Sequence, residues 1–153
     1  MNERFREHVE ALDPILQRLV SSAPVRFDGL PKSMPDSGVY LFSEDGVHLY
    51  VGRSKRLRNR LRYHATDRWL SASFAFLLAR EATGRIRPTY EKTGSRKELQ
   101  ADPAFRKAFL VACARINQMD IRFIGESDPV RQALLEIYAA ISLNTKYNKF
   151  ETT

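Results

Sequence analysis

Cysteine is almost absent from this sequence, since Cys113 is the only one among 153 residues. A lone cysteine excludes a disulfide framework within the chain and every metal site that is built from a cysteine cluster. Glycine and proline are also scarce, at seven residues each, which excludes collagen-like and low-complexity chains. The 43% of hydrophobic residues is enough to form an ordinary core, so we expect one folded domain over residues 1–153.

Membrane and secretion signals are missing as well. No apolar run approaches the roughly 20 residues that a membrane-spanning helix requires. Residues 1–8 are charged and lack the apolar segment of a secretory signal. These two absences predict a soluble, cytoplasmic protein without a membrane partner.

Positive charge is what the chain has in excess. Lysine and arginine number 25 against 18 acidic residues, for a net charge of +7. Such a balance favours a polyanionic partner, most simply nucleic acid. The charge is concentrated in residues 53–64, which read RSKRLRNRLRYH and contain no acid. A solvated helix face explains this run equally well when it is considered alone.

Hydrophobic periodicity predicts an α/β fold of the α+β type, with a small, mainly antiparallel three-stranded sheet flanked by helices. The expected strands are residues 39–42, 47–51 and 119–124. The expected helices are residues 3–20, 54–65, 70–82, 96–116 and 127–141. Pro14 is expected to interrupt the first helix and Pro103 the fourth, because proline lacks the N–H that a helix interior needs.

The turn Glu44-Asp45-Gly46 predicts a hairpin in one of two registers. A two-residue turn places Tyr40 across from Val51. A three-residue turn places Tyr40 across from Tyr50, and both tyrosines then share one face of the sheet with His48. The residues leave both registers open.

Glu136 lies on the last expected helix, for which the spacing predicts a single apolar face. That face comprises Val130, Leu134, Ile137, Tyr138 and Ile141. The same spacing directs Glu136 away from this face, as an exposed acid with small alanines around it.

Six ordered features of the chain together resemble the GIY-YIG nuclease superfamily. They are Gly38-Val39-Tyr40, Tyr50-Val51-Gly52, Arg60, His64, Glu136 and Asn148. Valine replaces isoleucine in both tripeptides, which preserves strand character. The resemblance leaves residues 1–36 as an N-terminal helix and loop, and residues 66–118 as a helical insertion that it does not explain. That insertion is basic, and it either contacts a nucleic-acid backbone or covers the sheet.

The resemblance implies an endonuclease that hydrolyses phosphodiester bonds, usually in DNA, with one divalent metal ion, Mg²⁺ or Mn²⁺. Tyr40 would then activate or orient the attacking water, and Tyr50 would contact the phosphate or assist. Arg60 would bind the scissile phosphate, and His64 is a candidate general base. Glu136 would be the metal ligand, which suits a hard cation that takes few protein carboxylates.

Four further residues are expected to bind the substrate: Arg53, Lys55, Arg56 and Asn148. Arg53 and Arg60 are also expected to lower the pKa of the tyrosines, because neighbouring cations favour the phenolate. Each residue alone has an ordinary explanation as a strand aromatic or a surface charge, so the hypothesis rests on the ordered set. The alternative is a module that binds nucleic acid without cutting it. A homodimer or a recruiting protein partner is compatible with either function.

Overall fold

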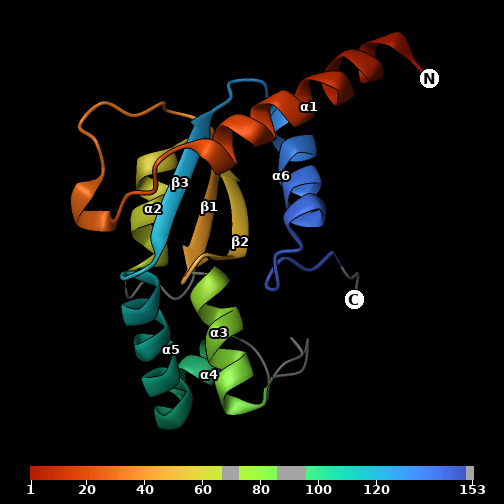
Figure 1. Cartoon of the computed structure of the whole chain (residues 1–153). Coiled ribbons are helices and arrows are strands. Elements are labelled where there is room, and N and C mark those ends of the chain that lie inside the picture. The colour runs from red at the N-terminus through yellow and green to blue at the C-terminus, as the bar shows by residue number, and fades with distance from the viewer. Residues whose placement is uncertain (67–72, 86–95, 151–153) are drawn as a thin grey trace. The chain divides into compact units, whose positions relative to one another are not determined.

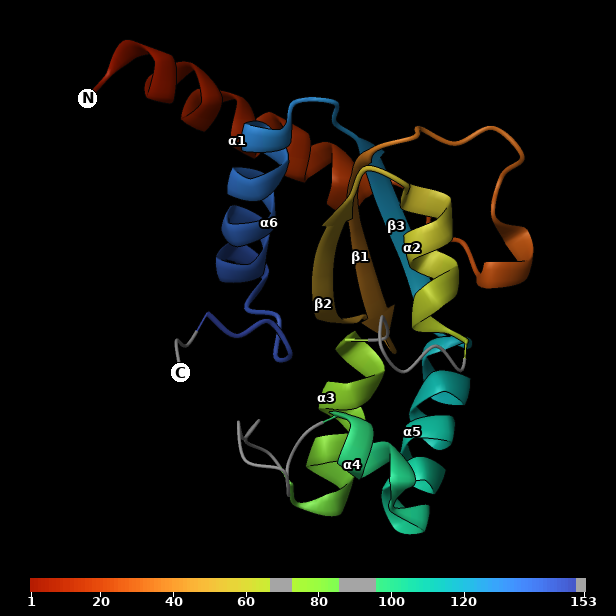
Figure 2. The same cartoon turned by 180° about the vertical axis from the view of Figure 1, so that it is seen from behind.

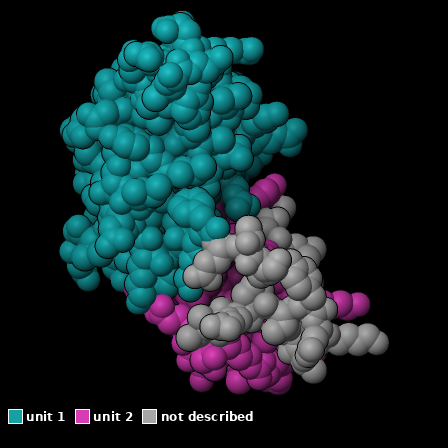
Figure 3. Space-filling model, turned by 90° about the vertical axis from the view of Figure 1, so that its right-hand side faces the viewer, with its two compact units in different colours: residues 1–60, 119–153 teal, residues 61–118 magenta. Residues whose placement is uncertain are grey.

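The computed structural model describes residues 1–66, 73–85 and 96–150. Its elements in chain order are α1 (Glu3–Ser21), η1 (Phe27–Gly29), β1 (Gly38–Glu44), β2 (Val47–Ser54), α2 (Leu57–His64), α3 (Ser73–Thr83), α4 (Arg96–Ala101), α5 (Pro103–Ile116), β3 (Asp120–Gly125) and α6 (Pro129–Leu143) (Figure 1). The chain divides into two compact units, residues 1–60 with 119–153 and residues 61–118 (Figure 3). The segment 66–118, expected as an insertion, belongs to the second unit, and its residues 67–72 and 86–95 lie outside the described part of the chain.

The first unit is built on a three-stranded antiparallel sheet with the strand order β2-β1-β3. This confirms the predicted α+β class and all three expected strands. The first motif, Gly38-Val39-Tyr40, lies on the central strand β1, and the second motif, Tyr50-Val51-Gly52, lies on β2 at the edge of the sheet. The two tripeptides are therefore hydrogen-bonded neighbours.

One face of the sheet forms the main core of the first unit. Val39, Leu41 and Val51 point to this face and pack with buried leucines and isoleucine of α1 and with α6. The start of α2 lies on the opposite side of the sheet from α1 (Figures 1 and 2). Because side chains alternate along a strand, Tyr40 and Phe42 are left on the α2 side.

Helix α1 is continuous through Pro14, so the predicted interruption is wrong. Pro14 is exposed, and so is Glu10 one turn earlier, whose carbonyl loses its helical partner to the proline ring. Water can satisfy that carbonyl, which reduces the cost of the proline. Burial of Leu12, Ile15 and Leu16 on the other face stabilises the helix across this point.

The hairpin follows neither of the two expected registers along its whole length. The turn has two residues, since Glu44 pairs with Val47, with Asp45 and Gly46 both at positive φ. A β-bulge then shifts the pairing by one residue between Phe42 and Ser43, and Tyr40 pairs with Gly52. The extra residue restores the arrangement that the longer turn would have produced, with Tyr40 and Tyr50 on the same face.

The second unit is helical in its described part, and aromatic side chains form its centre. The Phe76 ring lies 5.5 Å from Phe105 and 5.1 Å from Phe109, measured between ring centroids. Pro103 ends α4 and begins α5 as predicted, and the Asp102 carboxylate caps the new helix. Across the described ranges of both units, none of the helices has the length and apolarity needed to cross a membrane.

Candidate active site

The glycines of both motifs lie where another part of the chain comes too close for a side chain. A Cβ at Gly52 would overlap the phenol ring of Tyr40, its partner across the hairpin. A Cβ at Gly38 would overlap the backbone of Ile124 on β3. The absence of a side chain at Gly52 therefore leaves the space on the sheet that the Tyr40 ring occupies.

Tyr40 is the centre of the site and is only 1% exposed. Its ring meets Phe42 edge to face at 5.6 Å between centroids. Arg60 of α2 donates a hydrogen bond to the Tyr40 hydroxyl, and Tyr50 and Glu136 are close enough to raise the pKa of the same hydroxyl. Four predicted residues from β1, β2, α2 and α6 are thus brought together within the first unit.

Burial raises the pKa of Tyr40 well above its ordinary value, and the nearby Tyr50 adds to the increase. The positive charge and hydrogen bond of Arg60 oppose this increase without cancelling it. Arg60 therefore lowers the Tyr40 pKa, as expected of a neighbouring cation, but the net shift is upward because removing the phenol from water costs more than one guanidinium returns. Tyr40 is a protonated phenol at neutral pH.

Glu136 lies on a partly buried side of α6, and the predicted apolar face of that helix is only partly right, since Leu134 and Tyr138 pack against the core and its other three residues do not. Val130, Ile137 and Ile141 are exposed, with Ile141 at 70%, whereas Leu135 and Ala139 are fully buried. The small Ala139 and its neighbour Ala140 pack inward. This turns Glu136 toward β2 and leaves its side chain 25% exposed.

Arg53 of β2 forms an ion pair with Glu136, with 2.8 Å between the Arg53 Nε and one carboxylate oxygen. Burial raises the pKa of Glu136 above its ordinary value, and the charges of Arg53 and Arg60 offset only part of that increase. The carboxylate is therefore partly removed from water, paired with Arg53 and influenced by the charge of Arg60.

The donor set fits a magnesium-type ion better than a cation that needs a full protein cage. The described residues contain no group of three or more histidine, cysteine, aspartate or glutamate side chains that could hold a metal. Mg²⁺ commonly binds through one or two carboxylates and keeps waters and substrate oxygens as its other ligands. Glu136 supplies one such carboxylate, and Arg53 competes with a cation for it.

His64 lies at the end of α2, one helical turn after Arg60, and belongs to the second unit. Its side chain is fully buried, as are Leu57 and Leu61 on the same helix. The imidazole meets the Phe74 ring edge to face at 6.5 Å between centroids. Its assignment as a general base stays a prediction, and the structure places it in an interior rather than on an open surface.

His48 does not share the face of the tyrosines, because the bulge lies between it and Tyr50. Its Nδ1 is hydrogen-bonded to the Ser43 hydroxyl at 2.7 Å. Burial lowers the pKa of His48, with the positive charge of Arg122 adding to the effect. His48 is therefore a residue of the other sheet face.

Asn148 binds the backbone of β2. Its carboxamide accepts a hydrogen bond from the Val51 N–H and donates one to the Val51 carbonyl, both at 2.8 Å. The Thr145 hydroxyl donates to the same side-chain oxygen at 2.7 Å. The Asn148 side chain therefore satisfies the outward-facing backbone groups of Val51 at the edge of the sheet, in the way that a neighbouring strand would.

Lys55 and Arg56 are exposed at the turn between β2 and α2. They follow Arg53, which lies near the end of β2, and Arg56 is one helical turn before Arg60. Their expected role in substrate binding stays a prediction.

Solved structures similar to this chain are GIY-YIG endonuclease domains, whereas no family model and no curated protein matches it. The particular structures are those of the N-terminal endonuclease domain of UvrC from Thermotoga maritima. The magnesium-bound form is 20% identical, matches 97% of this chain and 100% of that chain, and has a TM-score of 0.38. A point mutant bound to its catalytic divalent cation gives the same identity and TM-score over 99% of that chain. At this level of similarity, function has to be inferred from the site.

Proposed function

We propose that the chain is a divalent-metal-dependent endonuclease that cleaves DNA phosphodiester bonds at the site around Tyr40, Tyr50, Arg60 and Glu136. The observation that carries this proposal is that a guanidinium from α2 and a carboxylate from α6 both act on one buried tyrosine hydroxyl of β1. Hydrolysis of a phosphodiester needs a cation for the phosphate, a ligand for a hard metal ion and a polar group for the attacking water. The site contains one of each.

Arg60 binds the scissile phosphate in this proposal, because a guanidinium can grip two phosphate oxygens at once. Its hydrogen bond to Tyr40 orients the phenol toward the same point. Tyr40 is protonated, so its hydroxyl orients the attacking water by a hydrogen bond before any proton is removed. A divalent ion bound at Glu136 would lower the pKa of its bound water and offset the charge of the phosphate.

Arg53 neutralises Glu136 in the structure described here. Its side chain is 47% exposed, which leaves the guanidinium room to turn toward a DNA phosphate. We place Arg53 among the substrate-binding residues on that basis, with the ion pair to Glu136 as its resting position.

The decisive experiment is nicking of supercoiled plasmid with Mg²⁺, with Mn²⁺ and with a chelator. Glu136→Ala and Arg60→Ala are expected to lower the rate at least about 100-fold, since removing one group that stabilises a transition-state charge costs that much. Glu10→Ala, an exposed acid on α1, is the matched control and should cut like the unaltered protein. Cutting that survives Glu136→Ala, or that needs no metal, would contradict the proposal.

A second series of variants separates the two roles of His64. If His64 is the general base, both His64→Gln and His64→Leu should lose DNA cutting. If His64 only packs in the interior, His64→Leu should still cut. The predicted base requires that both variants lose cutting while urea unfolding shows that His64→Gln remains folded. Retained cutting in His64→Leu would remove His64 from the catalytic set.

The same assay tests the alternative of binding without cutting. Duplex, branched and single-stranded DNA and RNA should be compared, because the substrate structure is open. Salt-sensitive binding with no cutting of any substrate would favour a non-catalytic binding module. One site of this kind nicks one strand, so double-strand cuts would call for a second copy of the chain or a partner protein.

A further inference from the structure

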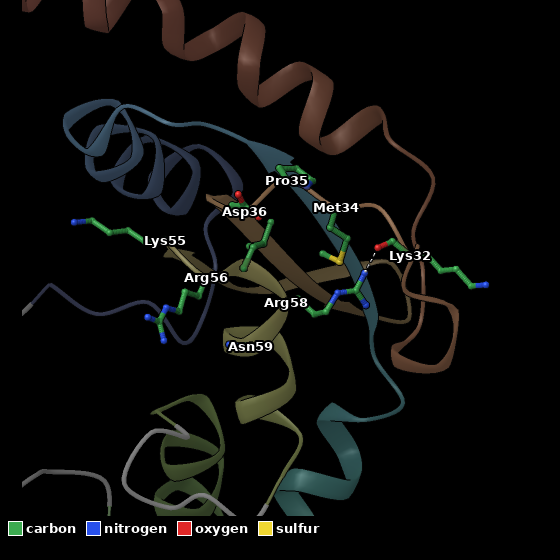
Figure 4. A pocket seen from close by; sticks show the side chains of 9 residues that line it. Lys32, Met34, Pro35, Asp36, Lys55, Arg56, Arg58 and Asn59 are labelled. Atoms are coloured by element: carbon green, nitrogen blue, oxygen red, sulfur yellow. Dashed lines mark hydrogen bonds between the residues drawn. The ribbon is translucent and has the colours of Figure 1, made fainter.

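A groove of about 430 Å³ lies between the loop that precedes β1 and the start of α2, within the first unit (Figure 4). Its lining residues are Lys32, Met34, Pro35, Asp36, Lys55, Arg56, Leu57, Arg58 and Asn59. Lys55 and Arg56 are two of the expected substrate-binding residues, whereas none of the nine is among the four residues to which we assigned the cleavage. The groove is therefore a separate feature beside the site.

Hydrogen bonds hold the two walls of the groove together. The Leu57 N–H donates to the Asp36 carbonyl at 2.8 Å. The Arg58 guanidinium donates to the carbonyls of Pro31 and Lys32, the latter at 3.1 Å. These bonds anchor the loop on the first turn of α2, so the groove has a defined shape.

The charge of the groove is strongly positive, with four cationic side chains and one acid, Asp36. Arg58 is engaged by the loop carbonyls. In the described ranges of the chain, no ion pair engages Lys32, Lys55 or Arg56. All three are exposed, so they are available to a partner in solution.

The cations do not converge on one point. Lys32 and Lys55 leave the groove on opposite sides, and Arg56 projects in a third direction (Figure 4). A small anion such as inorganic phosphate is bound best by donors aimed at one centre, whereas separated cations along a groove match the repeated charges of a polyanion. The arrangement therefore favours an extended phosphate backbone.

The groove also lies close to the proposed site along the chain of α2. Arg56 and Arg60 are four residues apart, which corresponds to about 6 Å of rise along a helix. The exposed cations at the start of α2 thus lie one helical turn from the arginine that acts on Tyr40. A strand whose phosphate is bound by Arg60 can continue into the groove.

We propose that this groove holds the phosphate backbone of the DNA strand next to the scissile phosphate, with Lys32 and Lys55 as its two charged rims. The inference rests on the proposed function and adds a positioning site outside the catalytic set. Met34 and Pro35 give the groove an apolar wall against which a sugar can pack. Asp36 opposes binding and limits its strength.

The test is binding of a fluorescent 25-base-pair duplex by anisotropy between 50 and 200 mM salt, with chelator present so that no cutting occurs. Lys32→Ala combined with Lys55→Ala should reduce the slope of log K against log salt by about 0.9 for each phosphate that the variant no longer neutralises. The matched control is Arg4→Ala combined with Arg6→Ala, which removes the same charge from an exposed part of α1. The control should keep the full slope.

Asp36→Asn provides a change of opposite sign, and it should tighten binding because it removes the one negative charge of the groove. Equal losses in the groove pair and in the control pair would show a general charge effect and would overturn the inference. No change in the groove pair, or weaker binding in Asp36→Asn, would also overturn it.

Two further arms separate the remaining outcomes. Inorganic phosphate at constant ionic strength should not displace the duplex, and displacement at millimolar phosphate would identify a small-anion site in place of the proposed one. Plasmid nicking tests the enzyme independently. A reduced slope without nicking would support DNA binding in the groove and contradict the proposed nuclease function. Nicking with an unchanged slope would support the nuclease function and contradict DNA binding in the groove.

Discussion

The close packing of Tyr40 on Gly52 leads to a prediction that can be worked out from the structure. In Gly52→Ala, the new methyl group would overlap the hydroxyl end of the Tyr40 ring. The ring cannot easily move aside, because Tyr40 is 1% exposed and contacts Phe42. We therefore expect the substitution to force the ring out of its position and to destabilise the first unit.

The size of the effect follows from two opposing contributions. Overpacking a well-packed core costs about 1–3 kcal/mol, and pushing a side chain off its rotamer adds about 0.5–1.5 kcal/mol. Replacing glycine by alanine inside a strand returns about 0.5–1 kcal/mol of backbone entropy. The net loss in the free energy of unfolding is about 2 kcal/mol, within a range of about 0.5–4 kcal/mol.

A double-mutant cycle with Tyr40→Leu isolates this contact. Leucine lacks the outer ring atoms that the methyl group would meet, so Gly52→Ala should be neutral or slightly stabilising in that background. The coupling energy between the two positions is then about 2–3 kcal/mol, within the range of residues in direct contact. Urea unfolding of the four proteins, followed by near-ultraviolet circular dichroism, measures it.

Gly29→Ala is the matched control, because a Cβ at Gly29 meets nothing within 4 Å. This control should leave stability unchanged or raise it slightly. An equal cost of Gly52→Ala with Tyr40 and with Leu at position 40 would refute the reasoning, since the glycine would then be required for a reason other than the ring.

Three further predictions follow from the contacts of Glu136 and Asn148. Arg53→Gln removes a competing cation from Glu136 and should tighten Mn²⁺ binding about fivefold, because one screened unit charge at about 4 Å is worth about 1 kcal/mol in water. Electron paramagnetic resonance of free Mn²⁺ measures this change, and weaker binding in Arg53→Gln would contradict it. Burial raises the pKa of Glu136. At a pH between the ordinary carboxyl pKa and this raised value, the folded chain therefore keeps a proton on Glu136 that the unfolded chain has already released. The free energy of unfolding should therefore fall as pH rises through that window and stay lower above it. Glu136→Gln removes this fall, so urea midpoints should show a larger advantage for the variant at pH 7 than at pH 4, and parallel pH profiles would argue against it. Asn148→Ala breaks two hydrogen bonds to Val51 and should cost about 1–3 kcal/mol in urea unfolding. Asn148→Asp, which keeps only an acceptor, should be destabilised as well, and unchanged stability in both variants would show that the tail does not hold the strand.

Sequence patterns were most informative where the signal is local. The alternation of aromatic and β-branched residues identified all three strands, and the helix expected over residues 127–141 corresponds to α6. The ordered motifs also selected Tyr40, Arg60 and Glu136, which the structure brings together. Each of these signals depends on neighbouring residues or on motif order, so it survives in the sequence.

Predictions failed where a contact between distant segments decided the outcome. The bulge in the hairpin set the pairing of Tyr40, and no local pattern encodes one extra residue in a ladder. The buried side of α6 includes Leu135 with the small Ala139 and Ala140, whereas the expected Val130, Ile137 and Ile141 are exposed. The sign of the Tyr40 pKa shift was decided by burial, which a list of neighbouring charges does not contain.

The sequence by itself determined the elements of this protein, its α+β class and the set of residues from which a site can be built. Propensity, capping and alternation act over a few residues, so they can be read along the chain. Only the tertiary structure decided that Glu136 faces Arg53, that Asn148 supports Val51 and that a basic groove forms beside α2. Those features depend on packing between segments far apart in the chain, because burial and close contact exist only after the chain has folded.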